Sequence, residues 1–377
     1  MIIRRRGFLK WLGALPLIIS ASGRAQPFSG FPEQSYRKAI IIDGLGDVVD
    51  PEHVEGKNLI SSRGIAELKQ SGMTAFHTTV NEVGNGLDAY EKTLSLISTT
   101  DAFIAANGTL LTKARTAADI RQAKADGKIA VVYGFQDTNV IGPQLERLKL
   151  FKDFGVRIVQ LTYNKRNLSG DGALEPANAG LSDLGRETID KIEALHLLLD
   201  LAHGGQRTIA EAIAHAKHPM LISHTGCRSL HDHPRNLGDT ELKAMANKAG
   251  VMGVYFMPFL TANNKPTRED VISHLNHAMK ICGEDHVSVG TDGDSTALVI
   301  DDKTREKQRK DFEDRRAKGI AAPGEGADIF TVVMDYNSHM RFRMLADDLA
   351  RAGWPIGRIE KILGGNLLRI YGEAWGA

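Results

Sequence analysis

The chain has 377 residues, of which 42% are hydrophobic and 25% are charged, a composition typical of a globular protein with a substantial core. Basic and acidic residues nearly balance, at 47 and 46, and no long basic block follows the first ten residues. This balance argues against nucleic acid as a partner.

Residues 1–25 have the pattern of an export signal. Arg5 and Arg6 form a pair that resembles the twin-arginine motif, an apolar run follows at residues 11–19, and small residues lead to Ala25. The run is well short of the roughly 20 residues that a membrane-spanning helix needs. We therefore expect a cleaved signal and a periplasmic or otherwise exported protein, with no stable membrane span in the mature chain. A basic start that occurs by chance and an uncleaved amphipathic anchor are the alternatives.

The mature chain, residues 26–377, is expected to form a single domain. Short apolar runs alternate in it with longer segments of helical period, and eight of the runs predict β-strands: Ala39 to Asp43, Thr74 to Val80, Ile129 to Gln136, Arg157 to Tyr163, Leu197 to His203, Met220 to His224, Val251 to Phe256 and Val287 to Asp292. Nearly continuous hydrophobic runs are typical of parallel strands that are covered on both faces.

Helical segments separate these strands, among them residues 87–106, 143–154, 184–194, 206–216, 239–248 and 268–281. Ser182 is suited to cap the third of these helices, and Pro143 to begin the second. Eight repeats of strand and helix predict an α/β protein with a TIM-type (β/α)8 barrel. The two cysteines, Cys227 and Cys282, do not make a disulfide framework, and their spacing does not tell whether they pair.

Residues 301–325 interrupt the repeat with a run of mixed charges. Alternating signs usually mark an exposed face, so we expect a solvated helix and loop inserted after the eighth strand. The alternative is a lid or a partner surface.

The active site of such a barrel lies at the carboxyl ends of its strands. The reactive side chains at these predicted ends are Asp43, Asp47, His77, Gln136, Tyr163, His203, His224, Tyr255 and Asp292. His203 and His224 give the strongest signal, because neutral imidazoles from neighbouring strands bind zinc-type metals, and carboxylates can complete the shell. His77 is expected to be a hydrogen-bonded structural residue, and Asp43 to fix a loop. His231 and His233, in a turn-rich stretch, are expected to be exposed.

Short motifs occur at these strand ends and near the carboxyl terminus in a characteristic order: Asp43-Gly44-Leu45-Gly46-Asp47, Leu161-Thr162-Tyr163-Asn164, Asp200-Leu201-Ala202-His203, Ser223-His224, His233-Pro234-Arg235-Asn236, Gly290-Thr291-Asp292 and Gly364-Gly365-Asn366-Leu367-Leu368-Arg369. Together they resemble the membrane dipeptidases, also called renal dipeptidases, of peptidase family M19. The resemblance covers residues 40–371 and is specific as a set, whereas each motif alone is weak.

The resemblance implies a barrel that binds two zinc ions through a bridging glutamate on the third strand and that cleaves dipeptides. It implies that His203 and His224 hold the second zinc and that Asp47 belongs to the first. Arg235 would bind the substrate carboxylate, and Asp292 would be the catalytic residue that moves protons at the reacting centre. Both roles suit the chemistry of a guanidinium group and of a carboxylate beside an activated water.

Three positions depart from the family pattern. Leu45 replaces a histidine of the first strand, Gln136 replaces the bridging glutamate, and Tyr163 stands where many members have a histidine. Tyr163 can still donate a hydrogen bond to the substrate. Two divalent ions about 3.5 Å apart repel each other by roughly 19 kcal/mol at an effective dielectric of 20, so the loss of the bridging anion is serious.

We therefore expect one zinc ion at most, held by His203 and His224 with help from the Gln136 oxygen, Asp47 or water. The leading hypothesis is an exported metallohydrolase that cleaves a dipeptide or peptide-like amide with a zinc-bound water. One alternative is a tailoring enzyme for a peptide-like metabolite, and another is a binding protein that retains Arg235 as its anchor. The sequence does not name the substrate and leaves a homodimer open.

Overall fold

The computed structural model describes residues 30–53, 56–84, 86 and 88–376. The predicted export signal at residues 1–25 lies outside the described residues. Within the described part of the chain, no helix is long and apolar enough to cross a membrane.

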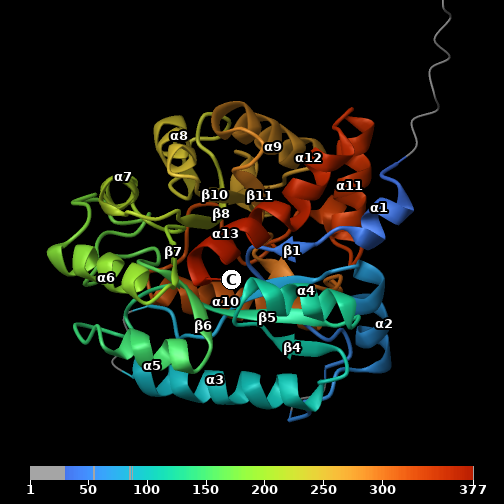
Figure 1. Ribbon diagram of the computed structural model, residues 1–377, viewed down its shortest axis with the longest axis horizontal. Helices are drawn as coiled ribbons and strands as arrows, with labels where there is room; N and C mark the ends of the chain where they lie inside the picture. The colour runs from blue at the N-terminus through green and yellow to red at the C-terminus, as the bar shows by residue number, and fades with distance from the viewer. Residues whose placement is uncertain (1–29, 54–55, 85, 87, 377) are drawn as a thin grey trace, which may run out of the picture.

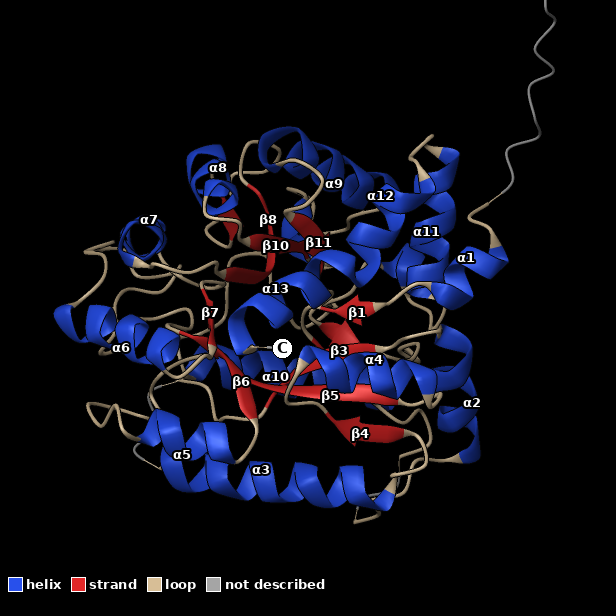
Figure 2. Cartoon of the chain, in the orientation of Figure 1, coloured by secondary structure: helices blue, strands red, loops and turns tan. Residues whose placement is uncertain are grey.

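Eight parallel strands form the centre of the molecule and confirm the predicted barrel (Figures 1 and 2). In their order around the sheet they are β1 (Ile42–Asp43), β3 (Ala75–Thr79), β5 (Ile129–Phe135), β6 (Val156–Gln160), β7 (Leu198–Asp200), β8 (Leu221–Cys227), β10 (Val251–Val254) and β11 (Val287–Val289). The spatial order equals the chain order, as right-handed β-α-β crossovers produce. Each strand overlaps one that the sequence predicts.

The first and last strands are joined at their carboxyl ends. The backbone N–H of Gly44 donates to the carbonyl of Val289 at 2.9 Å, and the short strands β2 (Gly46–Asp47) and β12 (Gly293–Asp294) pair just beyond. Two other short strands, β4 (Leu111–Lys113) and β9 (Asn236–Leu237), lie beside β5 and β8. With two or three residues each, these four strands are too short to give a hydrophobic period.

Helices surround the barrel in Figure 2. They are α1 (Glu33–Lys38), α2 (Ser62–Ser71), α3 (Ala89–Ala106), α4 (Ala117–Ala125), α5 (Arg147–Asp153), α6 (Asp183–Ala194), α7 (Gln206–His215), α8 (Asp239–Asn247), α9 (Arg268–Cys282), α10 (Asp302–Ala317), α11 (Arg341–Arg351), α12 (Ile356–Glu360) and α13 (Asn366–Trp375). Ser182 caps α6 as predicted, accepting from the N–H of Gly185. Pro143 does not begin α5, because Gly142 with φ +54° lies in a turn that delays the helix.

Two helices lie at opposite ends of the barrel. Helix α13 closes the amino end, where Leu367 and Tyr371 pack with the strand residues Ile42, Val132 and Leu198 in one apolar cluster. Helix α10 lies at the carboxyl end and lines cavities there together with residues that follow the strands. The two helices overlap in the view of Figure 1 only because that view runs through the barrel.

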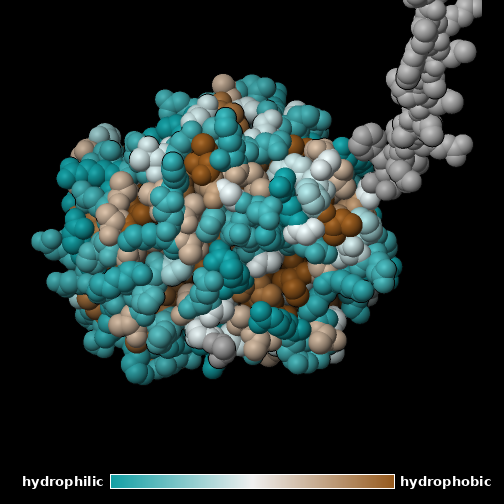
Figure 3. All heavy atoms as spheres, turned by 45° about the horizontal axis from the view of Figure 1, so that its top comes forward, coloured by the Kyte–Doolittle hydropathy of each residue, from teal (hydrophilic) through white to brown (hydrophobic). Residues whose placement is uncertain are grey.

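Figure 3 shows one face of the molecule coloured by hydropathy. The side in Figure 3 is mostly hydrophilic with small separate apolar groups. Cys227 and Cys282 are both buried as free thiols, so the described structure contains no disulfide between them.

Gly290, in the motif before Asp292, has a steric reason to be glycine. A Cβ atom at this position would lie 2.0 Å from the carbonyl oxygen of Ser223 on the neighbouring part of the barrel. The Gly290→Ala variant should therefore lose roughly 1–3 kcal/mol of unfolding free energy or more, measured by chemical denaturation. Gly357→Ala is the control: its Cβ meets nothing within 4 Å and lies in helix α12, so stability should be unchanged or slightly higher.

Candidate active site

One cavity at the carboxyl end of the barrel brings together four of the predicted site residues. It has a volume of about 230 Å³ and is lined by Tyr163, His203, Arg235 and Asp292. These residues follow strands β6, β7, β8 and β11. Side chains from α10 and the loop after it complete the wall: Gln308, Asp311, Phe312, Arg315, Ala322 and Glu325.

The His203 and His224 rings lie close together, with their centroids 4.8 Å apart. Nδ1 of His203 donates to the amide oxygen of Asn164 at 2.7 Å, and Nδ1 of His224 is hydrogen-bonded to the Ser223 hydroxyl at 2.8 Å. Both Nε2 atoms are buried without a hydrogen-bond partner. Burial, and next the Arg235 guanidinium, hold the pKa of both histidines well below the usual value. The pair therefore presents neutral nitrogen donors.

Arg235 supplies a buried cation to the cavity. Only 4% of the residue is exposed, and its Nη1 atom has no hydrogen-bond partner. The guanidinium carbon lies 6.0 Å from the centroid of the Tyr255 ring. A buried guanidinium N–H group without an acceptor is costly, so Nη1 remains available to bind an anionic ligand.

Asp292 stands beside this cation with an unusual backbone. Its φ is +54°, a left-handed conformation that non-glycine residues rarely adopt, and its N–H donates to the carbonyl of Leu45 at 2.8 Å. Burial raises the pKa of its carboxyl to about 7, against the lowering influence of the Arg235 and Arg315 guanidinium groups. His203 also has a positive φ, of +59°. Such backbone outliers cluster at functional sites.

Tyr163 is stacked on the His203 ring, with centroids 4.1 Å apart and an interplanar angle of 22°. Its hydroxyl accepts a hydrogen bond from Nη1 of Arg315 at 3.1 Å. The phenol proton therefore remains available to a ligand in the cavity.

Asp47, Gln136 and His224 are not among the described residues that line this cavity, although the His224 ring lies beside that of His203. Asp47 lies in β2 and accepts a hydrogen bond from the Thr78 hydroxyl. Gln136 directly follows β5 and is half-buried, and its N–H donates to the Asn81 side chain at 2.8 Å. Their assignment as metal ligands remains a prediction.

His203 and His224 have the chemistry of metal ligands. Two orphaned Nε2 atoms from neighbouring strand ends are suited to one zinc-type ion, and the bonds from Asn164 and Ser223 fix the ring orientations as metal sites require. No group of three or more His, Cys, Asp or Glu side chains that could hold a metal occurs in the part of the chain that the structure describes. The two histidines thus supply two of the donors that a zinc-type ion needs, and the number of ions stays a prediction.

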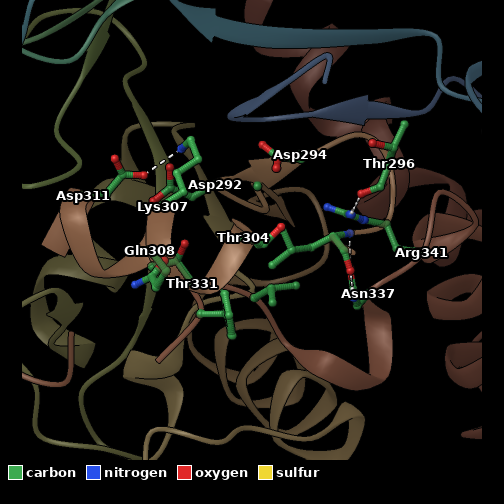
Figure 4. Close-up of a pocket in the computed structure, with 14 residues that line it drawn as sticks. Asp292, Asp294, Thr296, Thr304, Lys307, Gln308, Asp311, Thr331, Asn337 and Arg341 are labelled. Carbon is green, nitrogen blue, oxygen red and sulfur yellow. Dashed lines mark hydrogen bonds and ion pairs between the residues drawn. The ribbon is translucent and has the colours of Figure 1, made fainter. Parts of the chain in front are cut away.

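A second cavity of about 220 Å³ adjoins the first (Figure 4). Asp292, Gln308, Asp311 and Thr331 line both cavities, so the two spaces meet beneath α10. Lys307 pairs with Asp311 at 2.7 Å beside Asp292, as Figure 4 shows. The ligand-accessible space therefore runs along one face of this helix.

The preferred interpretation of residues 301–325 was incomplete. Helix α10 has no buried residue, as a solvated helix should, but one of its faces covers the site. Asp311, Phe312 and Arg315 follow Gln308 by three, four and seven residues, which places these side chains on that face. Charge composition alone does not distinguish this arrangement from an exposed helix.

The structure corrects the prediction for His233 and agrees with those for His77 and Asp43. His233 is buried rather than exposed: its Nδ1 accepts from the N–H of Arg235 at 3.1 Å, and its Nε2 donates to the carbonyl of Pro323 at 2.8 Å. His77 is hydrogen-bonded to the Gly44 carbonyl, and Asp43 accepts from the N–H and hydroxyl of Thr291, both in keeping with structural roles.

Sequence reasoning missed several contributors to the site. Asn164 occurs in one of the motifs, but the sequence alone gives it no role, although it orients His203. The sequence does not reveal the roles of Arg315 and Glu325, because both lie in a charged segment without a motif. Only the tyrosine-asparagine order in the fourth-strand motif offered a signal for Asn164.

The family model described as membrane dipeptidase (peptidase family M19) matches residues 42–312. The chain belongs to the membrane dipeptidase family. The match contains all eight barrel strands and the residues His203, His224, Arg235 and Asp292. It ends within α10, before Arg315.

Individual relatives of this family member include a solved structure described as an amidohydrolase from Pseudomonas aeruginosa. It is 30% identical, covers 91% of this chain and 99% of that chain, and has a TM-score of 0.78. The dipeptidase tcpJ of Claviceps purpurea is 30% identical over 48% of this chain and 44% of its own length, and verJ of Clonostachys rogersoniana is 29% identical over 51% of each. The chain thus spans about half the length of these two curated relatives.

A metallo peptidase from Rhodobacter sphaeroides, solved with a phosphinate mimic of the dipeptide L-Ala-D-Ala, shares the fold at a TM-score of 0.72 and 17% identity. That likeness covers 89% of this chain.

Proposed function

We propose that this membrane-dipeptidase family member hydrolyses a dipeptide or a peptide-like amide whose free carboxylate binds Arg235. The observation that carries the proposal is the buried Arg235 Nη1, which lacks a partner and lines the same cavity as His203 and Asp292. The names of the relatives tcpJ and verJ, both dipeptidases, favour the same reaction class.

In this proposal each side chain has a separate task. Arg235 binds and orients the substrate carboxylate, and the Tyr163 hydroxyl donates to a substrate oxygen. Asp292 accepts a proton at its carboxylate from the attacking water and returns it to the leaving amine; a pKa of about 7 suits both transfers at neutral pH. His203 and His224 would hold a single zinc ion, which in such sites activates water and polarises a carbonyl.

Metal analysis and dipeptide turnover of the purified mature protein test the proposal. We expect about one zinc ion per chain and hydrolysis of free-acid dipeptides, and we expect the His203→Ala variant to lose both. His218→Ala is the matched control, because His218 is exposed on the surface and should leave both measurements unchanged. Full turnover after complete removal of metal by a chelator would contradict the assignment of the histidine pair.

A second candidate function is that of a binding protein or tailoring enzyme for a peptide-like metabolite. It is favoured by the lack of a three-ligand metal group among the described residues and by Leu45 in the first-strand motif. A small molecule that is released unchanged from the purified protein, together with no metal and no dipeptide turnover, would select the binding protein.

We also propose export by the twin-arginine route. Replacing Arg5 and Arg6 by lysine should leave the precursor in the cytoplasm, measured by cell fractionation and immunoblotting. Arg4→Lys, next to the pair, is the control and should not affect export. Unchanged export of the double variant would contradict the route.

A further inference from the structure

A short segment beyond the family match contacts the residues that orient the site. This segment, residues 315–325, contains the end of α10 and the loop that follows it. The family model ends at residue 312. Three separate hydrogen-bonded connections run from the segment to the barrel mouth.

The first connection reaches Tyr163 through Arg315. Nε and Nη2 of Arg315 bind the two carboxylate oxygens of Glu325 at 2.6 and 2.8 Å, and Nη1 donates to the Tyr163 hydroxyl at 3.1 Å. The side chain of Glu325 is only 7% exposed, so the ion pair is shielded from water. A bidentate pair of this kind holds the guanidinium plane in one orientation.

The second connection reaches His203 through Asn164. The Asn164 amide nitrogen donates to the carbonyl of Ile320 at 2.7 Å, while its amide oxygen accepts from Nδ1 of His203 at 2.7 Å. Ile320 is itself tied to the helix end, because its N–H donates to the carbonyl of Arg315 at 3.0 Å. His203 is therefore held on its edge by Asn164 and on its face by Tyr163, and both groups bond to this one segment.

The third connection reaches Arg235 through His233. The carbonyl of Pro323 accepts from Nε2 of His233, whose Nδ1 accepts the N–H of Arg235. Both ring nitrogens of His233 are thus occupied in the neutral form. The segment therefore touches the orienting groups of both the predicted metal ligand and the predicted carboxylate anchor.

We propose that Arg315, fixed by Glu325, is a positioning residue that acts through Tyr163 on the placement of the His203 ring and the reacting substrate oxygen. The guanidinium donates to the phenol oxygen, which leaves the phenol proton to point into the cavity, and it holds the phenol ring flat against His203. Helix α10 has no buried apolar side chain, so polar bonds of this kind hold it over the mouth. The part of the inference that concerns turnover rests on the proposed hydrolase function.

The test compares Arg315→Gln with Arg309→Gln in the full mature chain. Arg309 lies on the same helix and is exposed, so its variant makes the same change in charge away from the site. We expect Arg315→Gln to lower kcat for dipeptide hydrolysis about ten- to a hundredfold, the loss typical of one hydrogen bond to a charged group, with a smaller change in KM. Arg309→Gln should match the unmodified protein.

A double-mutant cycle with Tyr163→Phe separates positioning from a general structural effect. In the Tyr163→Phe background, Arg315→Gln should change kcat less than threefold, because the bond through which it acts is already absent. Equal losses in both backgrounds would overturn the proposal. Should Arg315→Gln fail to fold, Glu325→Gln keeps the hydrogen-bonding shape of the pair while removing its charge, and the same cycle applies.

A readout without turnover keeps this inference distinct from the proposed function. In metal-free protein labelled with ¹⁵N at the histidine rings, Arg315→Gln but not Arg309→Gln should shift the His203 resonances. His286, bonded to the Gly250 carbonyl, is an internal reference. Absence of dipeptide turnover in the unmodified protein with these shifts present would refute only the hydrolase; unchanged His203 resonances would refute the positioning role.

Discussion

The Arg235→Ala variant is expected to lose most of its affinity for ligands with a free carboxylate. The guanidinium is buried and has an unpartnered Nη1 in the cavity, so its removal eliminates a charge-assisted pair in a site shielded from water. Losses of about 2–5 kcal/mol are typical when one partner of a buried charged pair is truncated, which corresponds to a thirtyfold to several-thousandfold weaker binding. Titration calorimetry with the phosphinate mimic of L-Ala-D-Ala would measure it.

The ligand provides the sharper control for this prediction. An amidated dipeptide lacks the carboxylate, so Arg235→Ala should change its binding far less than that of the free acid. Arg207→Ala is the protein control, because that side chain is 61% exposed and pairs with Glu211 on helix α7. Equal losses for the amidated and free-acid ligands would mean that Arg235 supports the fold rather than the ligand.

The substitutions Gln136→Glu and Leu45→His, at the two positions predicted to have lost a metal ligand, are expected to change the metal content in unequal steps. Gln136→Glu alone should raise metal affinity at the His203 and His224 pair, because a charged oxygen replaces an amide dipole, without loading a second ion. Leu45→His alone supplies a nitrogen but no bridging anion. The double variant should approach two metal ions per chain and gain dipeptidase activity.

The effects of the two substitutions should be strongly non-additive, since both act on one site. The comparison needs four proteins: the unmodified chain, the two single variants and the double variant. Elemental analysis and dipeptide turnover would be measured on each, with circular dichroism to show that each is folded. Leu45 is only 4% exposed, so a histidine at this position could disturb the fold, and circular dichroism is the control for that effect. Two tightly held zinc ions in the unmodified protein would contradict the argument from ligand loss, and Asp47 and Asp292 would then be the first candidates for the missing charge.

The barrel could be predicted from sequence because its central strands are buried on both faces and appear as continuous apolar runs, such as Ile129 to Phe135. Strands β2 and β12 could not be predicted, because a two-residue pair is defined only by the chain that lies beside it. The turn at Gly142 overrode the helix-starting preference of Pro143 for a similar reason: local propensity is weak against a backbone conformation fixed by its surroundings.

The place of the site could be predicted because His203 and Asp292 lie at strand ends and Arg235 lies in a family motif, and the structure brings these three around one cavity. Their roles stay predictions. The site was not predictable where a side chain acts through a neighbour. His233 and Arg315 could have been surface residues by composition, and only the fold brings His233 to Pro323 and Arg315 to Tyr163. Charge runs do not reveal which of their faces is turned inward.

The bonds that join the first and last strands also determine when the site can exist during synthesis. The Asp43 carboxylate accepts from the N–H and hydroxyl of Thr291, a residue 248 positions later in the chain. A nascent chain that ends before this point has neither the partner of Asp43 nor Asp292, so it cannot form the complete mouth. Truncated products should therefore expose unpaired strand edges and be prone to aggregation, and the site should form only after the chain has been made past Asp292.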